Sequence, residues 1–472
     1  MKIFKITKIS FVIILLWSSL VFAQQQECFL LMVGKEASAT GQVLLAHNND
    51  LSGDEASMVV RVPAGQGIDY LPDDQFDFGS RYEMLILQTN IGFKEGDAVG
   101  INEKGVAVAG GLSMKKDRNS QIKETDPLIK SGLGGGVRYF ALQHAKTARE
   151  CINIIGQCYE HYGVSYLSGF GIADTNEIWY LETGGGKSWA AVRIPDDHYF
   201  VGANSYRIGE IDLSDTANVI CSDNLKNIAK NGRFNFQRSF GGGFREKSGN
   251  NHYNTRRIWR GIHLLNPEKD IFSGDEYFPL SCNPKEKITL EQTFDLLRDY
   301  YSGTEFSIYK NGELNDEERA IASWRCVHTD VITLTPGKPV DYGAVLWTGL
   351  STPFTAIYVP FYYGIESVPE AYSFAPTSYD KQSAFWLFKH LGDLCRPDYP
   401  QKMKSWIKKR EQFEQMIIEE HCGILNNMKS LDPSEGREYL TGRTQKFSNT
   451  ALRMTKEMID SLEMERDKPR SG

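Results

Sequence analysis

Long hydrophobic runs are scarce in this sequence, because beyond residue 23 no apolar stretch approaches the length of a membrane span. Cysteine is scarce too, and eight widely spaced cysteines in 472 residues exclude a disulfide-dense scaffold. Positive charge is not in excess: the net charge is -7, and no stripe of lysine and arginine opposes it. These absences argue against a nucleic-acid partner and predict a globular chain with no membrane association once its leader is removed.

Motifs for metals and common cofactors are absent as well. The histidines show no metal-ligand spacing, and Cys151 and Cys158 have no paired histidine. The glycine-rich residues 132–136 lack the Gly-Lys-Ser/Thr ending of a phosphate-binding loop, and no dinucleotide fingerprint surrounds them. The sequence therefore predicts no metal and no cofactor.

The N-terminus has the pattern of an export signal. Lysines precede the apolar residues 9–16, and Val21-Phe22-Ala23 forms a small-residue cleavage site. We expect a signal peptide over 1–23, a short propeptide over 24–27 and a periplasmic or extracellular mature protein. Residues 28–472 contain no repeat, linker or low-complexity segment, which predicts a single domain.

Cys28 is the most informative residue, because removal of residues 24–27 would make it the N-terminus. It would then carry a thiol and a terminal α-amine, whose unperturbed pKa of about 7.7–8.0 lets it accept the thiol proton near neutral pH. Three alternatives stay open: a buried structural cysteine, a lipid-modified cysteine and a disulfide partner. The lipid reading is weakened by Gln25-Gln26-Glu27, which is not a small apolar run.

Strand patterns occur in pairs before and after helical ones, which favours an α+β fold with layered sheets over a doubly wound parallel fold. Residues 28–50 predict two strands joined by a turn at 39–41. Further strands are expected over 81–88, 98–102, 105–109, 169–174, 177–182, 188–194, 199–203, 327–334, 344–347 and 356–360, and helices over 137–157, 253–265 and 290–301. From about 401 the chain is charged and helical by period, with breaks expected at Gly423, Pro433 and Gly442. These charged helices could pack between subunits of a homo-oligomer.

Several segments in order along the chain resemble one known family. The first runs from Cys28 to Asp50, and the others are 145–150, 172–174, 179–182, 192–197, 203–208, 259–261, Trp347 and 360–364. Together they resemble the secreted and lactobacillal dipeptidases of the N-terminal nucleophile class, to which the penicillin V and bile-salt acylases are related. The resemblance implies a four-layer αββα sandwich with the catalytic cysteine at the start of a central strand, exposed by autoprocessing.

The resemblance implies catalytic roles for Cys28, Asp50 and Asn204. An Asp50 carboxylate could hydrogen-bond the Cys28 α-ammonium or anchor the amino group of the substrate, while its spacing alone suggests a turn-capping residue. The Asn204 amide is suited to an oxyanion, although asparagine is also frequent at strand ends. Asn102 is a weaker second donor, because its Asn-Glu-Lys-Gly context predicts a turn.

A dipeptide has an ammonium and a carboxylate end, so its recognition calls for an acid and an arginine. Glu182 and Arg207 are the candidates, with Arg257 or Arg260 as alternatives to Arg207; ordinary ion pairs are an equal reading of each. Several family members carry an arginine where this chain has His47, which we expect near the substrate. His328, a lone histidine before a strand, is expected to be a core residue.

We interpret the chain as an exported, self-processing cysteine dipeptidase that acts on short peptides. The first alternative is an acyl-amide hydrolase of the penicillin V or bile-salt type, with the aromatic-rich residues 357–363 lining an acyl slot. The second is a degenerate or lipid-anchored binding protein, supported only by the His47 departure.

Overall fold

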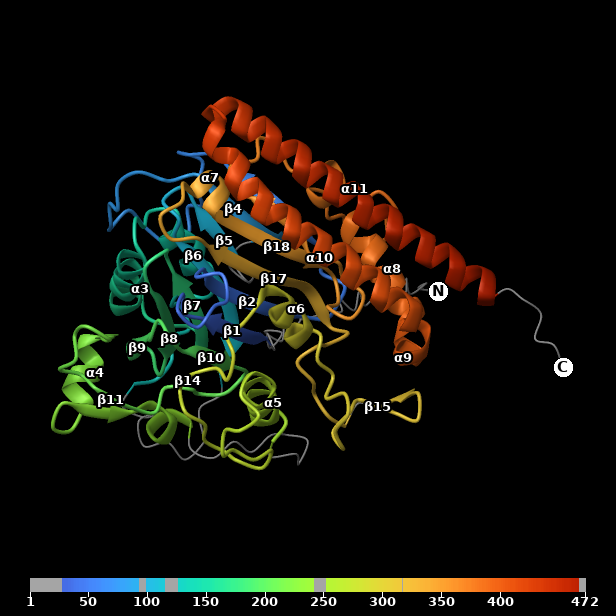
Figure 1. Cartoon of the computed structure of the whole chain (residues 1–472). Helices are drawn as coiled ribbons and strands as arrows, with labels where there is room; N and C mark the ends of the chain where they lie inside the picture. Colours follow the sequence, from blue (N-terminus) through green and yellow to red (C-terminus); the bar gives the residue numbers. More distant parts are fainter. Residues whose placement is uncertain (1–27, 93–98, 115–125, 242–251, 316, 467–472) are drawn as a thin grey trace, which may run out of the picture.

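The computed structural model describes residues 28–92, 99–114, 126–241, 252–315 and 317–466 (Figure 1). The predicted signal peptide 1–23 and propeptide 24–27 lie outside these residues. Among the helices in these ranges, none combines the length and the apolar character that a membrane crossing requires.

An antiparallel seven-stranded sheet places the segment that follows Cys28 at its centre. Its order is β14 (Ser281–Cys282), β10 (Tyr199–Gly202), β1 (Phe29–Val33), β2 (Val43–Asp50), β17 (Cys326–Leu334), β18 (Ala344–Leu350) and β19 (Val359–Tyr362). Every residue of β1, β2 and β17 is buried. The predicted pair of strands in residues 28–50 is confirmed, since β1 and β2 pair antiparallel.

A second antiparallel sheet of eight strands packs against the first. Its order is β12 (Val219–Cys221), β9 (Trp189–Ile194), β8 (Ile178–Thr183), β7 (Ser168–Ala173), β6 (Ala107–Ser113), β5 (Val99–Asn102), β4 (Met84–Thr89) and β3 (Ser57–Val62). The contact runs from β1 and β2 to β6 and β7. At Gly110 φ is +104°, a backbone angle that glycine permits, and a Cβ there would lie 3.3 Å from the Phe170 backbone of β7.

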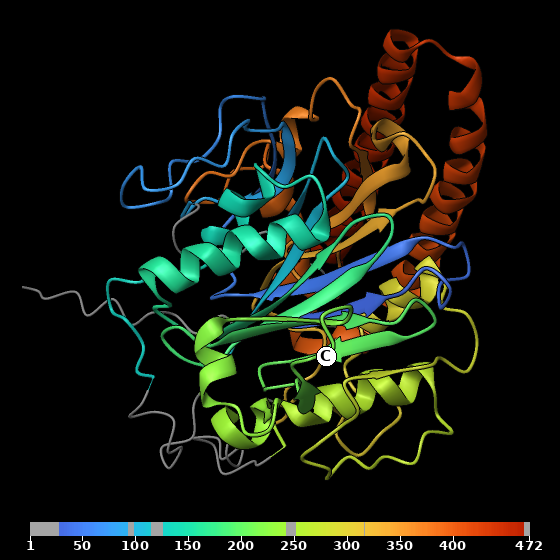
Figure 2. The same ribbon diagram turned by 90° about the vertical axis from the view of Figure 1, so that its left-hand side faces the viewer.

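Helices contact both sheets, and the C-terminal helices lie beside the seven-stranded one (Figures 1 and 2). Helices α2 (Val137–Leu142) and α3 (Ala148–Tyr162) contact strands β5 to β8. The helices that contact strands of the other sheet include α5 (Thr255–Leu265), α6 (Leu290–Leu297), α8 (Ala384–Cys395) and α11 (Pro433–Arg466). Helix α10 (Lys404–Asn427) packs on α6 and is joined to α11 by the ion pair between Glu420 and Arg443.

Shorter elements complete the described chain. They are β11 (Glu210–Asp212), β13 (Arg233–Asn235), β15 (Tyr309–Lys310), β16 (Glu313–Leu314), α4 (Asp223–Ile228), α7 (Val340–Gly343), α9 (Tyr399–Lys402) and the single turns Gln237–Gly241, Glu370–Tyr372, Arg396–Asp398 and Met428–Ser430.

Two helix predictions were wrong. The single helix expected over 137–157 is two helices, because the Thr147 side chain accepts from the Glu150 amide and starts α3 anew. The breaks expected at Gly423 and Gly442 do not occur, and only Pro433 marks a boundary, at the first residue of α11. A glycine inside a helix costs about 1 kcal/mol, which the packing of a long helix outweighs.

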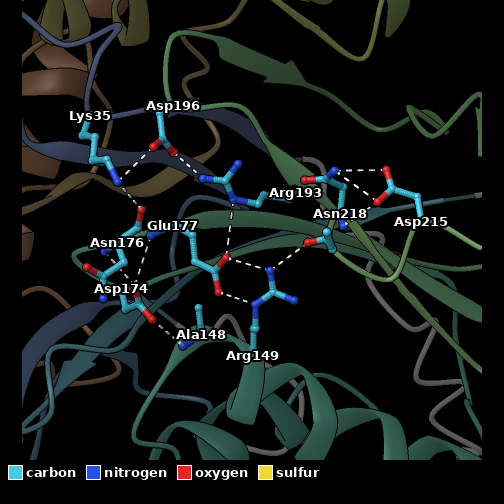
Figure 3. Close-up of polar contacts among 11 residues, drawn as sticks. Lys35, Ala148, Arg149, Asp174, Asn176, Glu177, Arg193, Asp196, Asp215 and Asn218 are labelled. Atoms are coloured by element: carbon cyan, nitrogen blue, oxygen red, sulfur yellow. Dashed lines mark hydrogen bonds and ion pairs between the residues drawn. The ribbon is translucent and has the colours of Figure 1, made fainter.

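A surface network joins the far end of β1 to the second sheet (Figure 3). Arg149, near the start of α3, holds Glu177 through two hydrogen bonds of 2.8 and 3.1 Å. Lys35 and Arg193 both pair with Asp196, at 2.9 and 2.6 Å. All of these residues except Glu177 come from segments that resemble the dipeptidase family, and their contacts here are structural.

Candidate active site

Cys28 directly precedes β1, and its side chain is fully buried. The register pairs Phe29 with Asn48 and Leu30 with Gly202, so the next position brings Cys28 beside Asn49 of β2 and close to the residues that follow β10. The Cys28 Sγ lies 3.7 Å from Asn49 Oδ1 and donates to it. The sequence predicted the start of a central strand here, and the structure places the thiol there.

Arg257 of α5 connects Cys28 to Asn204. One guanidinium nitrogen donates to the Cys28 carbonyl oxygen at 3.1 Å, and another donates to Asn204 Oδ1 at 3.0 Å. Asn204 Nδ2 donates to the Ser113 carbonyl at 3.2 Å, and Asn254 donates to the Asn204 carbonyl at 3.1 Å. Because a guanidinium only donates, the Asn204 amide is fixed with its oxygen toward Arg257 and its nitrogen pointing elsewhere.

Asp50, the last residue of β2, is buried and paired with an arginine that the sequence analysis did not single out. Its Oδ2 lies 2.6 Å from Nη2 of Arg319, which is itself buried. Tyr253, which precedes α5, lies below the same guanidinium at 5.7 Å. Asp50 is therefore a carboxylate held by a buried charge.

Cys326 is a second thiol near Cys28. Burial raises its pKa well above the usual range, and the charges of Asp50 and Cys28 raise it further. Its Sγ donates to the His328 carbonyl oxygen at 3.0 Å. Because only the thiolate is a strong nucleophile, a Cys326 thiol with so high a pKa is expected to be a poor nucleophile.

His47 of β2 is fully buried, and its charged partner is Asp330 of β17. Its Nδ1 lies 3.6 Å from Asp330 Oδ1, and His328 Nδ1 lies 2.8 Å from the same oxygen. Burial would raise the pKa of Asp330, but the two histidines outweigh burial and lower it. Ligand atoms of His47, His328 and Asp330 lie within 4.8 Å of one another. Among the residues that the structure describes, this is the group that could hold a metal ion.

Glu182 is fully buried and binds backbone amides. Its two oxygens accept from the amides of Arg207 and Ile208. Burial raises its pKa to about 7, against the lowering effect of these two hydrogen bonds.

Arg207 donates to backbone carbonyls of Val201, Phe278, Pro279 and Leu280 at 2.6–3.4 Å. Burial lowers its pKa. Glu182 and Arg207 thus hold the chain on both sides of Asn204 and fix the loop that carries this amide.

Two other candidates are engaged elsewhere. Asn102 donates to the carbonyls of Leu142 and Ala145, and its oxygen accepts from two amides of its own turn. The turn reading of Asn102 is therefore confirmed. Arg260 makes a two-pronged ion pair with Asp299 at 2.9 and 2.7 Å.

Sequence reasoning missed Arg319, Asn49, Asn254 and Asp330, whereas the expectation that His328 is a core residue is confirmed by its burial. For Asn49 a signal was present, because four polar residues in a row (47–50) are unusual on a central buried strand. Arg319 offered no signal, since it meets Asp50 across 269 positions of sequence.

The site thus holds a buried thiol beside a strand start, with an amide and a guanidinium fixed next to it. The profile of Peptidase family C69 matches residues 27–412. The chain belongs to Peptidase family C69, the N-terminal nucleophile family of cysteine dipeptidases.

Curated relatives agree with this membership. The chain is 28% identical over 462 residues to "Probable dipeptidase B" of Lactococcus lactis, covering 92% of this chain and 94% of that protein. It is 30% identical over 363 residues to "Probable dipeptidase" of Salmonella dublin (72% and 81%) and 27% identical over 423 residues to "Dipeptidase" of Bifidobacterium longum (78% and 77%).

Among solved structures, the chain is similar to a Caenorhabditis elegans ortholog of N-acylethanolamine-hydrolyzing acid amidase. The identity is 10% and the TM-score 0.29, over 66% of this chain and 94% of that one.

Proposed function

We propose that this chain is an exported cysteine dipeptidase whose nucleophile is Cys28, exposed by autoprocessing after residue 27. Membership of Peptidase family C69 and the dipeptidase names of the relatives support the activity. The observation that carries the assignment is the pair of hydrogen bonds by which Arg257 joins Cys28 to Asn204.

We further propose the four-layer αββα arrangement of N-terminal nucleophile hydrolases. Its support is the pair of facing antiparallel sheets, with α2 and α3 against one and α5, α6, α8 and α11 against the other. The position of Cys28 before a central strand agrees with this arrangement.

In the first half of the reaction, the Cys28 sulfur attacks the carbonyl carbon of the peptide bond, and the thiol proton moves to the α-amine of the same residue. The carbonyl oxygen becomes an oxyanion, to which the Asn204 amide donates. The α-ammonium then gives its proton to the leaving nitrogen, the carbon–nitrogen bond breaks, and a thioester forms as the second amino acid departs.

In the second half, water attacks the thioester while the α-amine takes up one of its protons. The carbon–sulfur bond breaks, the first amino acid leaves with a carboxylate, and the proton returns to the thiolate. Asp50 stabilises the α-ammonium that exists between these transfers, and Arg319 keeps this carboxylate in place.

The contacts of Glu182, Arg207 and His47 support positioning roles for them within the same site. Glu182 and Arg207 fix the loop of Asn204, and His47 belongs to the buried group around Asp330. Arg257, the alternative arginine of the sequence analysis, lies at Cys28.

The acyl-amide alternative has less support. The aromatic segment expected to line an acyl slot is buried from Ile357 to Tyr363. Tyr358 stacks on Phe294 of α6 at 3.9 Å between ring centroids, which places it in the protein core.

The deciding experiment is intact-mass and N-terminal analysis of the secreted protein beside a Cys28→Ala variant, with dipeptide hydrolysis measured on both. We expect the wild type to begin at Cys28 and to cleave dipeptides, and the variant to keep residues 24–27 and be inactive. A Cys326→Ala variant is the matched control, because it removes the neighbouring thiol and should mature and cleave normally.

The opposite results are equally clear. If the wild type and the variant both begin at residue 24, the α-amine mechanism is wrong. A lipid-sized mass on Cys28 would make the protein a lipoprotein, and cleavage of acyl amides in preference to dipeptides would favour the acylase alternative.

A further inference from the structure

A row of polar side chains leads from Cys28 into the protein core. His47 and Asn49 lie two residues apart on β2, and His328 and Asp330 lie two apart on β17, so each pair shares one face of its strand. The register places Asn49 opposite His328 and His47 opposite Asp330. All four side chains are at most 1% exposed.

This row lies on the face turned toward the eight-stranded sheet. Leu45 is on the same face of β2, and its side chain lies 2.5 Å from the position that a Cβ on Gly171 of β7 would take. Burying polar groups between two sheets is unfavourable unless they satisfy one another. The row therefore needs an explanation beyond packing.

The contacts form a continuous chain that ends at the nucleophile. Asp330 Oδ1 lies 2.8 Å from His328 Nδ1, and His328 Nε2 lies 2.9 Å from Asn49 Nδ2. Asn49 Oδ1 accepts from the Cys28 thiol at 3.7 Å. His47 adds a second contact to Asp330 at 3.6 Å and helps to keep that carboxylate charged.

The donor and acceptor properties of these groups fix their orientation one after another, from Asp330 to Cys28. Asp330, an acceptor, selects the His328 tautomer with hydrogen on Nδ1, which leaves Nε2 as an acceptor. The Asn49 nitrogen must then face His328, because it can only donate. The Asn49 oxygen consequently faces Cys28, where it holds the thiol hydrogen and the sulfur position.

We propose that Asp330, His328 and Asn49 are positioning residues that hold the Cys28 thiol in its reactive orientation, with His47 securing Asp330. This proposal rests on Cys28 being the nucleophile and goes beyond the proposed dipeptidase mechanism, which gives Asp330, His328 and Asn49 no role and places His47 only as a member of the buried group. None of them touches substrate in this role, since each acts through the next.

The test is a double-mutant cycle on the mature protein with Asn49→Leu and His328→Phe. The rate of Cys28 alkylation by iodoacetamide is followed from the mass of the N-terminal peptide, together with kcat, KM and the free energy of unfolding. We expect each single change to lower the alkylation rate and kcat by about tenfold to a hundredfold, the size of effect that a small misplacement causes, with KM unchanged. The double variant should be no slower than the slower single one, because both changes break the same chain.

Two further variants separate positioning from folding. His328→Gln carries a donor and an acceptor on one amide, so it should restore most of the lost rate. Thr329→Val is the matched control: this buried hydroxyl on the same strand donates to Asn48 at 2.6 Å, outside the row. The control should lower stability and leave the alkylation rate unchanged.

If His328→Phe does not fold, the isosteric Asn49→Asp decides the question. A carboxylate in place of the amide oxygen repels the Cys28 thiolate, so the pH midpoint of alkylation should rise. An unchanged midpoint would overturn the proposal.

Three other results would overturn it: additive effects in the cycle, equal slowing by Thr329→Val, or a stoichiometric transition metal bound in the purified protein through His47, His328 and Asp330. Alkylation needs no substrate, so these rates remain informative even if the wild type fails to cleave dipeptides. Failure of dipeptide cleavage would count against the proposed function alone.

Discussion

The Arg319 guanidinium lies 2.6 Å from the Asp50 carboxylate, and both side chains are buried at the end of β2. Removing one member of a buried ion pair leaves the other charged in the protein interior. We therefore expect Arg319→Ala to lower the free energy of unfolding by about 3–5 kcal/mol. Urea unfolding measures this change.

A matched control is the exposed pair of Arg233 and Glu210, whose side chains are 63% and 60% exposed. Arg233→Ala should leave the unfolding midpoint nearly unchanged, because exposed pairs contribute little. If Arg319→Ala were as mild as the control, Asp50 would not depend on this arginine.

Asn204 is expected to act on the transition state. Replacing it with alanine removes the proposed oxyanion donor, so kcat for a dipeptide should fall by about 10²–10³-fold. KM should change little, whereas the unfolding midpoint should fall, because Arg257 and the Ser113 carbonyl lose their hydrogen bonds to Asn204. A variant with normal kcat would remove Asn204 from the mechanism.

Arg257→Lys tests the bridge between Cys28 and Asn204. A lysine ammonium is a compact charge and cannot reproduce the fork that reaches both the Cys28 carbonyl and Asn204 Oδ1. We expect kcat to fall although the charge is kept. Full activity in the lysine variant would show that charge alone suffices.

Glu182 gives the stability a defined pH dependence. Burial raises its pKa from 4.5 to about 7. The folded protein then binds the proton of the Glu182 carboxyl group more tightly than the unfolded chain does. The contribution of Glu182 to the free energy of unfolding is therefore complete below the unfolded pKa of 4.5 and is lost as the pH rises through about 7.

This pKa shift corresponds to a fall of about 3 kcal/mol in the free energy of unfolding between pH values below 4.5 and pH values above about 7. Urea unfolding at several pH values, for the wild type and Glu182→Gln, measures it. The variant should be less stable at low pH, because an NH2 group, which only donates, replaces one of the two oxygens that face backbone amides. Its stability should fall less than that of the wild type between these pH values. Parallel pH curves would contradict the assignment.

Arg149 provides a prediction of a weak effect. Its pair with Glu177 joins side chains that are 39% and 15% exposed, at the far end of β1 from Cys28. We expect Arg149→Met to destabilise the fold by about 1 kcal/mol or less, with a smaller effect at high salt and unchanged kcat. A loss of activity would mean that this network reaches the site.

The sequence predicted the parts of the site that depend on local pattern. The position of Cys28, the two strands after it and Asn204 at a strand end follow from the predicted export signal, the alternation of strands and turns, and the family resemblance. Partners contributed by distant segments were not accessible, since Arg319 meets Asp50 and His328 meets Asn49 across 269 and 279 positions. His328 reaches Asn49 because β17 pairs with β2 within the seven-stranded sheet, and such long-range pairing leaves no local pattern.

Charged residues were the hardest to interpret, for a related reason. Glu182 and Arg207 have the right chemistry for the ends of a dipeptide, but their partners are backbone groups at 201, 207, 208 and 278–280. Backbone carbonyls and amides are present at every position, so a sequence cannot show which of them a buried charge will bind.

The order of strands in the central sheet also sets the timing of the enzyme's assembly. Cys28 directly precedes β1, whereas β17, which brings His328 to Asn49, begins at Cys326. A chain made from its N-terminus therefore contains the Cys28 thiol long before the residues that surround it, and contacts of such long range form slowly. The proposed site is incomplete until β17 has been made and has paired with β2, so cleavage of neighbouring peptides is expected only after that step.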